Sequence, residues 1–161
     1  MLRLLRRFLS LCALLFWQGG FTFYTAVVIP IAGSVLEGTH LRGRISAQVF
    51  LWLNVAGVAT LVLLLWEMAS TKGRRGGRFV CWAVMLVTLM GLFGLHYWLR
   101  VLDPHPGSGT GAENSSVFWV AHSTYIWVSI VQWLTALVYL ALTIRVWRAE
   151  DAAPAAGEEK V

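Results

Sequence analysis

The sequence predicts an all-α membrane protein, a four-transmembrane-helix bundle with both termini cytoplasmic. Hydrophobic residues make up 58% of the 161 residues, charged residues only 13%, and the mean hydropathy is +0.67. An ordinary soluble domain has about a quarter of its residues charged, so this composition excludes that class. The chain also contains four long apolar runs, and a helix of about 20 apolar residues is enough to cross the hydrocarbon of a bilayer.

The four predicted spans cover about residues 8–31, 45–68, 79–99 and 117–144. Inside a bilayer the backbone must pair its own N–H and C=O groups, and these runs lack the alternation of barrel strands, so each is expected to be a helix. No small-residue cleavage site follows the basic, apolar start, which predicts a retained first span rather than a signal peptide. Residues 1–148 then form the transmembrane domain. The Ala- and Glu-rich segment 149–161 has little to bury and is expected to be a disordered cytoplasmic tail.

Lysine and arginine are distributed unevenly along the chain. Ten of the thirteen lie in the N-terminus, the second connection and the C-terminus, and three lie in the other two connections. Because these residues accumulate on the cytoplasmic side, both termini are expected there, in a cell membrane of the bacterial inner-membrane type. Aromatic residues at the inner span ends, among them Trp147, are expected to anchor the helices at the interface. The basic connection 72–78 is expected to bind anionic lipid headgroups.

One polar side chain lies near the middle of each span, and together these predict a mid-membrane polar layer of Gln18, Asn54, Thr88 and Gln132. Polar side chains at this depth need a partner or a cavity. Two interpretations stay open: interhelical hydrogen bonds that fix the packing, or a site for a small lipid-soluble ligand such as a quinone. Under both, glycines would let the helices approach closely, at Gly19, Gly20, Gly57, Gly91 and Gly94.

All four histidines fall at the predicted outer face, together with three acidic residues: His40, His96, His105, His122, Glu37, Asp103 and Glu113. His96 and His122 are expected at equal depth on consecutive helices, where they could ligate a b-type haem with Arg100 near its propionates. The same pair could instead bind a transition metal with further ligands drawn from His40, His105, Asp103 and Glu37. Proton transfer and ordinary interfacial packing are the alternatives for these histidines.

The first span contains four residues at helical spacings of three, four and three, namely Gly20, Phe23, Val27 and Pro30. These spacings place them on one face of a helix. With Phe50 in the second span, a charged inner connection and His122 opening the fourth span, the chain resembles the small four-span proteins of domain-of-unknown-function family 4149, similar to the transmembrane protein 205 group. The resemblance covers most of residues 10–144. It implies a multi-pass membrane protein without an established activity, loosely linked to resistance or secretion phenotypes, and it carries over no catalytic residues.

Three functions are compatible with these observations. The sequence favours a non-enzymatic accessory or assembly subunit that acts by interaction with a membrane protein partner or as a homo-oligomer, since no GxSxG, P-loop, GxGxxG, CxxCH or nucleic-acid-binding motif is visible. A haem- or metal-binding protein that uses His96 and His122 is the second. The third is a small oligomeric transporter or permeability factor, with Gln18, Asn54 and Gln132 along its path.

Overall fold

The computed structural model describes residues 1–36, 39–71, 76–102 and 116–152. In these residues almost the whole chain is helical. Four helical rods are long and apolar enough to cross a membrane: Leu2–Val35, Leu41–Ser70, Gly76–Val101 and Trp119–Ala152. The predicted all-α class is therefore confirmed for the described part of the chain, with four helices long and apolar enough to cross a membrane.

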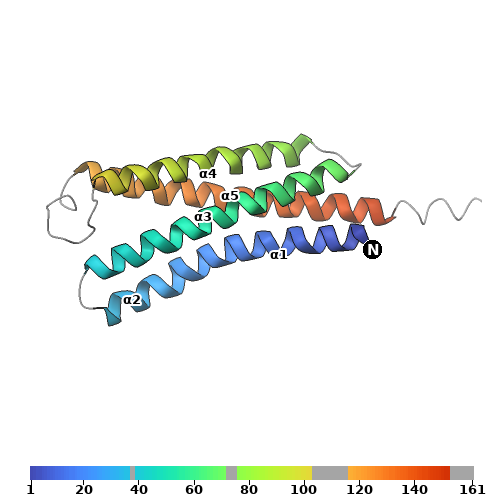
Figure 1. The fold of residues 1–161 in the computed structure, drawn as a ribbon. Coiled ribbons are helices and arrows are strands. Elements are labelled where there is room, and N and C mark those ends of the chain that lie inside the picture. Colours follow the sequence, from blue (N-terminus) through green and yellow to red (C-terminus); the bar gives the residue numbers. More distant parts are fainter. Residues whose placement is uncertain (37–38, 72–75, 103–115, 153–161) are drawn as a thin grey trace, which may run out of the picture.

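The first rod consists of three consecutive elements, α1 (Leu2–Phe23), the π-helix η1 (Tyr24–Val28) and α2 (Ile29–Val35). The other rods are α3 (Thr39–Ser70), α4 (Gly76–Leu102) and α5 (Ser116–Ala152). In Figure 1 the rods lie side by side as one bundle, in which α1 packs on α3, α3 on α4, and α4 on α5. One end of the bundle holds the start of α1 and the end of α5, and we call it the terminal end. The opposite end, where α2 leads to α3, is called the α2–α3 end.

Each helix turns a narrow stripe of side chains toward the bundle interior. On α5 the buried residues are spaced by three or four positions, at Ala121, Tyr125, Ser129, Gln132, Ala136, Tyr139, Thr143 and Trp147. This spacing is typical of helices that pack nearly parallel with interdigitating side chains. The central core combines Trp17, Met85 and Tyr139 with leucines from α1, α3 and α4.

Two of the five glycines expected to allow close helix approach do so. A Cβ on Gly57 would lie 2.5 Å from the ring of Trp17, and one on Gly20 would lie 2.9 Å from Leu53. Gly57 therefore lets the large indole of α1 sit directly on the backbone of α3. The other three, Gly19, Gly91 and Gly94, have no neighbouring atom within 4 Å of such a Cβ, so they do not mediate a contact of this kind.

The π-helix η1 follows from Pro30 at the start of α2. Proline has no N–H to donate, and its ring crowds the carbonyl four residues earlier, which disturbs the regular i to i−4 hydrogen bonds. The N–H of Ile29 accordingly bonds the carbonyl of Tyr24, five residues back. The rod continues through this point as one helical segment, with its α-helical register shifted before α2 begins.

The helices extend beyond the predicted spans, most clearly at α5. The tail was expected from Ala149, but α5 continues to Ala152. The reason is that Glu150 and Asp151 face α1 and form ion pairs with its arginines, so these residues belong to the bundle and not to the tail. Residues 153–161 lie outside the described residues.

Candidate functional site

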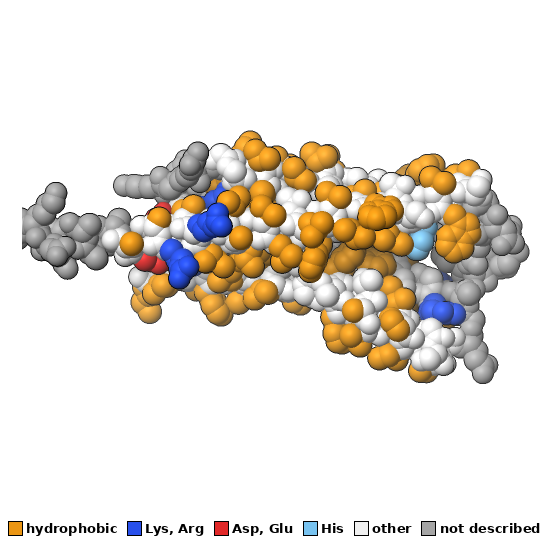
Figure 2. Space-filling view, turned by 180° about the vertical axis from the view of Figure 1, so that it is seen from behind, with side chains coloured by type: hydrophobic (Ala, Val, Ile, Leu, Met, Phe, Trp, Pro, Cys, Tyr) orange, Lys and Arg blue, Asp and Glu red, His pale blue; other side chains and the backbone are white. Residues whose placement is uncertain are grey.

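A cavity of about 360 Å³ opens on the side of the bundle between the first rod and α5. The space-filling view in Figure 2 shows a hollow between two helical bodies on this face, with hydrophobic side chains around it. Its walls come from three rods. Phe50 belongs to α3, and the remaining lining residues come from the first rod and α5: Phe21, Thr22, Thr25, Ala26, Ile29, His122, Tyr125, Ile126, Ser129, Ile130 and Trp133.

Small side chains on both facing helices explain why this space is not filled. The first rod presents Thr22, Thr25 and Ala26 to the cavity, and α5 presents Ser129. None of these reaches far across the interface, whereas large side chains elsewhere interdigitate. The aromatic rings of Phe21 and Phe50 in the cavity wall lie 5.2 Å apart between centroids.

Three hydroxyls of the cavity wall take part in hydrogen bonds. The hydroxyls of Thr22 and Ser129 donate to the carbonyls of Gln18 and Tyr125 in their own helices, each at 2.8 Å. The hydroxyl of Tyr125 accepts a hydrogen bond from the Asn54 amide at 3.4 Å. Because side-chain hydroxyls bonded to their own helix expose mainly carbon, the wall behaves as an apolar surface.

The four residues of the predicted polar layer have different environments. Asn54 and Gln132 are buried, and Gln18 and Thr88 are half-buried. Asn54 bonds Tyr125, while the Thr88 hydroxyl donates to carbonyls of its own helix. Within the described residues no hydrogen bond joins two members of the layer, and none of the four lines the cavity. The Oδ1 atom of Asn54 and the Nε2 atom of Gln132 are buried without a partner.

The described structure places the two histidines of the haem prediction in different settings. His122 is exposed, lines the cavity and meets Trp119 edge to face at 6.1 Å between ring centroids. His96 is half-buried on α4 and does not line the cavity, and Arg100 is exposed. In the described part of the chain no three His, Cys, Asp or Glu side chains form a group able to hold a metal ion. Haem or metal ligation therefore stays a prediction.

The structure does not describe the side chains of the other proposed metal ligands. Glu37, Asp103 and His105 lie outside the described residues, and His40 is the second residue of α3 with its side chain outside them. Residues 72–75 of the basic connection also lie outside the described residues. Its last arginine, Arg78, is almost fully buried, so its charge is not exposed at the protein surface.

A buried ion pair, which the sequence analysis did not single out, lies near the terminal end. Glu67 of α3 pairs with Arg78 of α4, and each side chain is only 1% exposed. The Glu67 carboxylate also accepts hydrogen bonds from Thr71 and Trp147, both at 2.8 Å. One signal could have revealed it: Glu67 is the single acidic residue inside the four predicted spans. An ionisable group at such a position needs a partner to be stable.

Arg78 has a second partner on α5. Its Nη2 atom donates to the hydroxyl of Tyr139 at 3.3 Å, and its guanidinium lies over the Tyr139 ring at 5.5 Å. The Tyr139 hydroxyl in turn donates to the carbonyl of Leu64 at 3.4 Å. The pair is thus covered by α5 and isolated from the protein surface.

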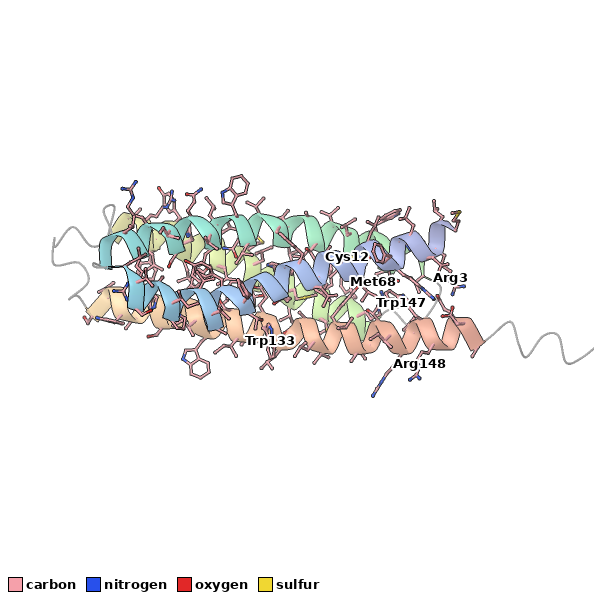
Figure 3. The ribbon with its side chains drawn as sticks, turned by 90° about the horizontal axis from the view of Figure 1, so that it is seen from below. Arg3, Cys12, Met68, Trp133, Trp147 and Arg148 are labelled. Atoms are coloured by element: carbon pink, nitrogen blue, oxygen red, sulfur yellow. The ribbon has the colours of Figure 1, made fainter. Side chains whose placement is uncertain are left out.

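The terminal end is closed by further ion pairs between α1 and α5. Arg7 pairs with Glu150 and Asp151 at 2.9 Å each, and Arg3 pairs with Glu150 at 2.5 Å. Arg7 also lies over the ring of Trp147 at 5.1 Å. In Figure 3 Trp147 points from α5 into the bundle, whereas Arg148 points away. These ion pairs therefore join α1 to α5 at the terminal end. The cavity lies between the same two rods, closer to the α2–α3 end.

Fold and cavity together define the class: a bundle of four helices long and apolar enough to cross a membrane, with an apolar cavity at its side. Comparison with protein-family models, with curated proteins and with solved structures finds no significant match to this chain. Function is therefore inferred from the geometry.

Proposed function

We propose that the chain is a non-enzymatic membrane protein that binds a small lipid-soluble molecule in the cavity between the first rod and α5. The observation that carries the proposal is the cavity itself, at about 360 Å³ and lined almost entirely by carbon. Ligand sites in proteins commonly measure about 300–1,000 Å³ and are mostly apolar with few polar groups. This cavity falls at the lower end of that range.

The position of the cavity supports access from the membrane. It lies at the side of the bundle, between helices whose outer surfaces carry exposed apolar side chains such as Phe23, Ile126 and Val131. A molecule dissolved in the hydrocarbon can therefore enter sideways without crossing water. The adjacent π-helix is a second supporting feature, because such segments are frequent at functional sites.

We propose the accessory role, the cell-membrane location and the cytoplasmic termini as parts of the same function. The uneven distribution of lysine and arginine supports this orientation. The start of α1 and the end of α5 lie at the same end of the bundle, where ion pairs join them. The similarity to family 4149 belongs to this proposal too, and it is supported by the spacing of Gly20, Phe23, Val27 and Pro30.

Photolabelling tests the proposal directly. The purified protein in mild detergent is incubated with a small hydrocarbon that carries a diazirine, irradiated, and mapped by mass spectrometry. We expect saturable labels on residues 21–29 and 122–133. An Ala26→Phe variant fills the cavity and should lose most of this labelling. Val87→Phe is the matched control because Val87 is a lipid-facing residue of α4, 67% exposed. Equal, non-saturable labelling of α4 and the cavity would refute the proposal.

A further inference from the structure

The cavity is elongated along the helix axes. On α5 its lining runs from His122 to Trp133, and on the first rod from Phe21 to Ile29. At 1.5 Å per residue these stretches are about 16 Å and about 12 Å long. Lipid chains lie in the same direction as membrane-crossing helices, and one leaflet contributes about half of a hydrocarbon core about 30 Å thick. The cavity therefore has the direction and length of a single lipid chain.

The wall of the cavity offers few polar groups to a ligand. The hydroxyls of Thr22 and Ser129 donate to carbonyls of their own helices, and the Tyr125 hydroxyl accepts a hydrogen bond from Asn54. A strongly polar group placed there would recover only part of the hydrogen bonding it has in water, which is costly in an apolar environment. The wall therefore fits a hydrocarbon chain.

Basic groups lie at the α2–α3 end of the cavity. His122 is the lining residue nearest the start of α5. Arg42 lies on the other side, against the first rod. Its Nη1 atom is 3.4 Å from the position that a Cβ on Gly33 would occupy. Gly33 itself is one helical turn beyond the lining residue Ile29. The Nε atom of Arg42 is buried without a partner. Figure 2 shows a histidine and a basic side chain on the two sides of the hollow at this end.

Arginines are present at both ends of the bundle, but their settings differ. At the terminal end Arg3, Arg7 and Arg78 form ion pairs with Glu67, Glu150 and Asp151. The described arginines of the α2–α3 end are Arg42, Arg44 and Arg100. Arginine binds phosphate through charge-assisted hydrogen bonds from its planar guanidinium. Among these three, Arg42 lies beside Gly33, one helical turn from the cavity lining, so its charge suits an anionic headgroup at this end.

We propose that the cavity holds one acyl chain of an anionic phospholipid, whose phosphate lies at the α2–α3 end beside Arg42 and His122. This inference rests on the proposed function, because it names the ligand class of the same cavity. The chain occupies the space between the first rod and α5, and the headgroup stays at the membrane surface, where the guanidinium of Arg42 supplies a positive charge.

Native mass spectrometry with defined lipids tests the inference. The delipidated protein is mixed with phosphatidylglycerol or phosphatidylcholine that carry identical acyl chains with a terminal diazirine. We expect one bound lipid per chain, a preference for phosphatidylglycerol, and chain-end labels on Ile130 or Trp133. Arg42→Gln should reduce the preference about fivefold, the contribution of one basic residue near a lipid surface. Arg100→Gln, which removes an exposed arginine at the same end, should leave the preference unchanged.

The outcomes separate the two proposals. Equal binding of both lipids, or equal effects of the Arg42 and Arg100 substitutions, would overturn the phospholipid inference. Preferential binding of an isoprenoid of similar length would overturn it as well. In each of these cases saturable cavity labelling by the headless hydrocarbon probe would still support the proposed function, and loss of that labelling alone would refute both.

Discussion

The indole N–H of Trp147 donates a hydrogen bond to Oε1 of Glu67 across 2.8 Å. This bond connects α5 to α3 in the protein interior, where Trp147 is 9% exposed. Glu67 in turn pairs with Arg78 of α4, and Arg7 of α1 lies over the Trp147 ring. A single acidic side chain and its indole partner therefore link all four rods near the terminal end.

Breaking the buried ion pair should destabilise the bundle strongly. In Arg78→Met the carboxylate of Glu67 stays buried without its counter-ion, and the expected loss of unfolding free energy is about 3–5 kcal/mol. Thermal unfolding in detergent, followed by circular dichroism, measures this. Arg145→Met is the control because Arg145 is exposed on α5.

The double variant Glu67→Leu with Arg78→Met distinguishes charge from packing. Replacing both partners of a buried ion pair by apolar residues is often close to neutral, so the double variant should recover most of the stability lost in Arg78→Met alone. A double variant as unstable as the single one would show that packing around these side chains, and not the unpaired charge, carries the effect.

Trp147→Phe isolates the indole hydrogen bond. Phenylalanine keeps an aromatic ring beneath Arg7 but has no donor for Glu67, so we expect a loss of about 1–3 kcal/mol, the range for an unsatisfied buried acceptor. The same substitution at Trp127, which is 67% exposed on α5, should change the melting temperature little. Equal shifts for both variants would argue against a structural role for the Trp147 bond.

Gly57→Ala tests the close contact between α1 and α3. The added methyl group would lie 2.5 Å from the Trp17 ring, so one helix must move, and we expect a loss of about 1–3 kcal/mol. Gly91→Ala is the matched control, since nothing lies within 4 Å of its added Cβ. There the better helix propensity of alanine should make the change neutral or stabilising by up to about 1 kcal/mol. Helix stability in detergent is the measurement for both.

The ion pairs between α1 and α5 should respond to salt. At about 1 M salt the screening length falls to about 3 Å, which weakens the partly exposed pairs of Arg3 and Arg7 with Glu150 and Asp151. We expect faster amide hydrogen exchange in residues 145–152 at high salt and in Arg7→Gln at low salt. The buried pair of Glu67 and Arg78 should be little affected, and its neighbours on α3 serve as the internal reference. Unchanged exchange in Arg7→Gln would contradict a role for these pairs in holding the end of α5.

The four rods could be predicted because they depend on local properties of the chain. Apolar length and the need to pair the backbone in hydrocarbon lead to helices whatever the neighbours are. Trp147 shows where such reasoning fails. An aromatic residue at a span end is expected at the interface, but a carboxylate on another helix gives its N–H a buried partner.

Composition, apolar run length and the positions of charged residues were sufficient to predict the all-α class, the four long apolar helices and an end of the bundle shared by the start of α1 and the end of α5. They did not reveal the pairing of Glu67 with Arg78 or the cavity beside α5. Both depend on the rotation and register of helices far apart in the sequence. A shift of one residue turns a side chain by about 100° around its helix, and only packing among all four rods selects one arrangement.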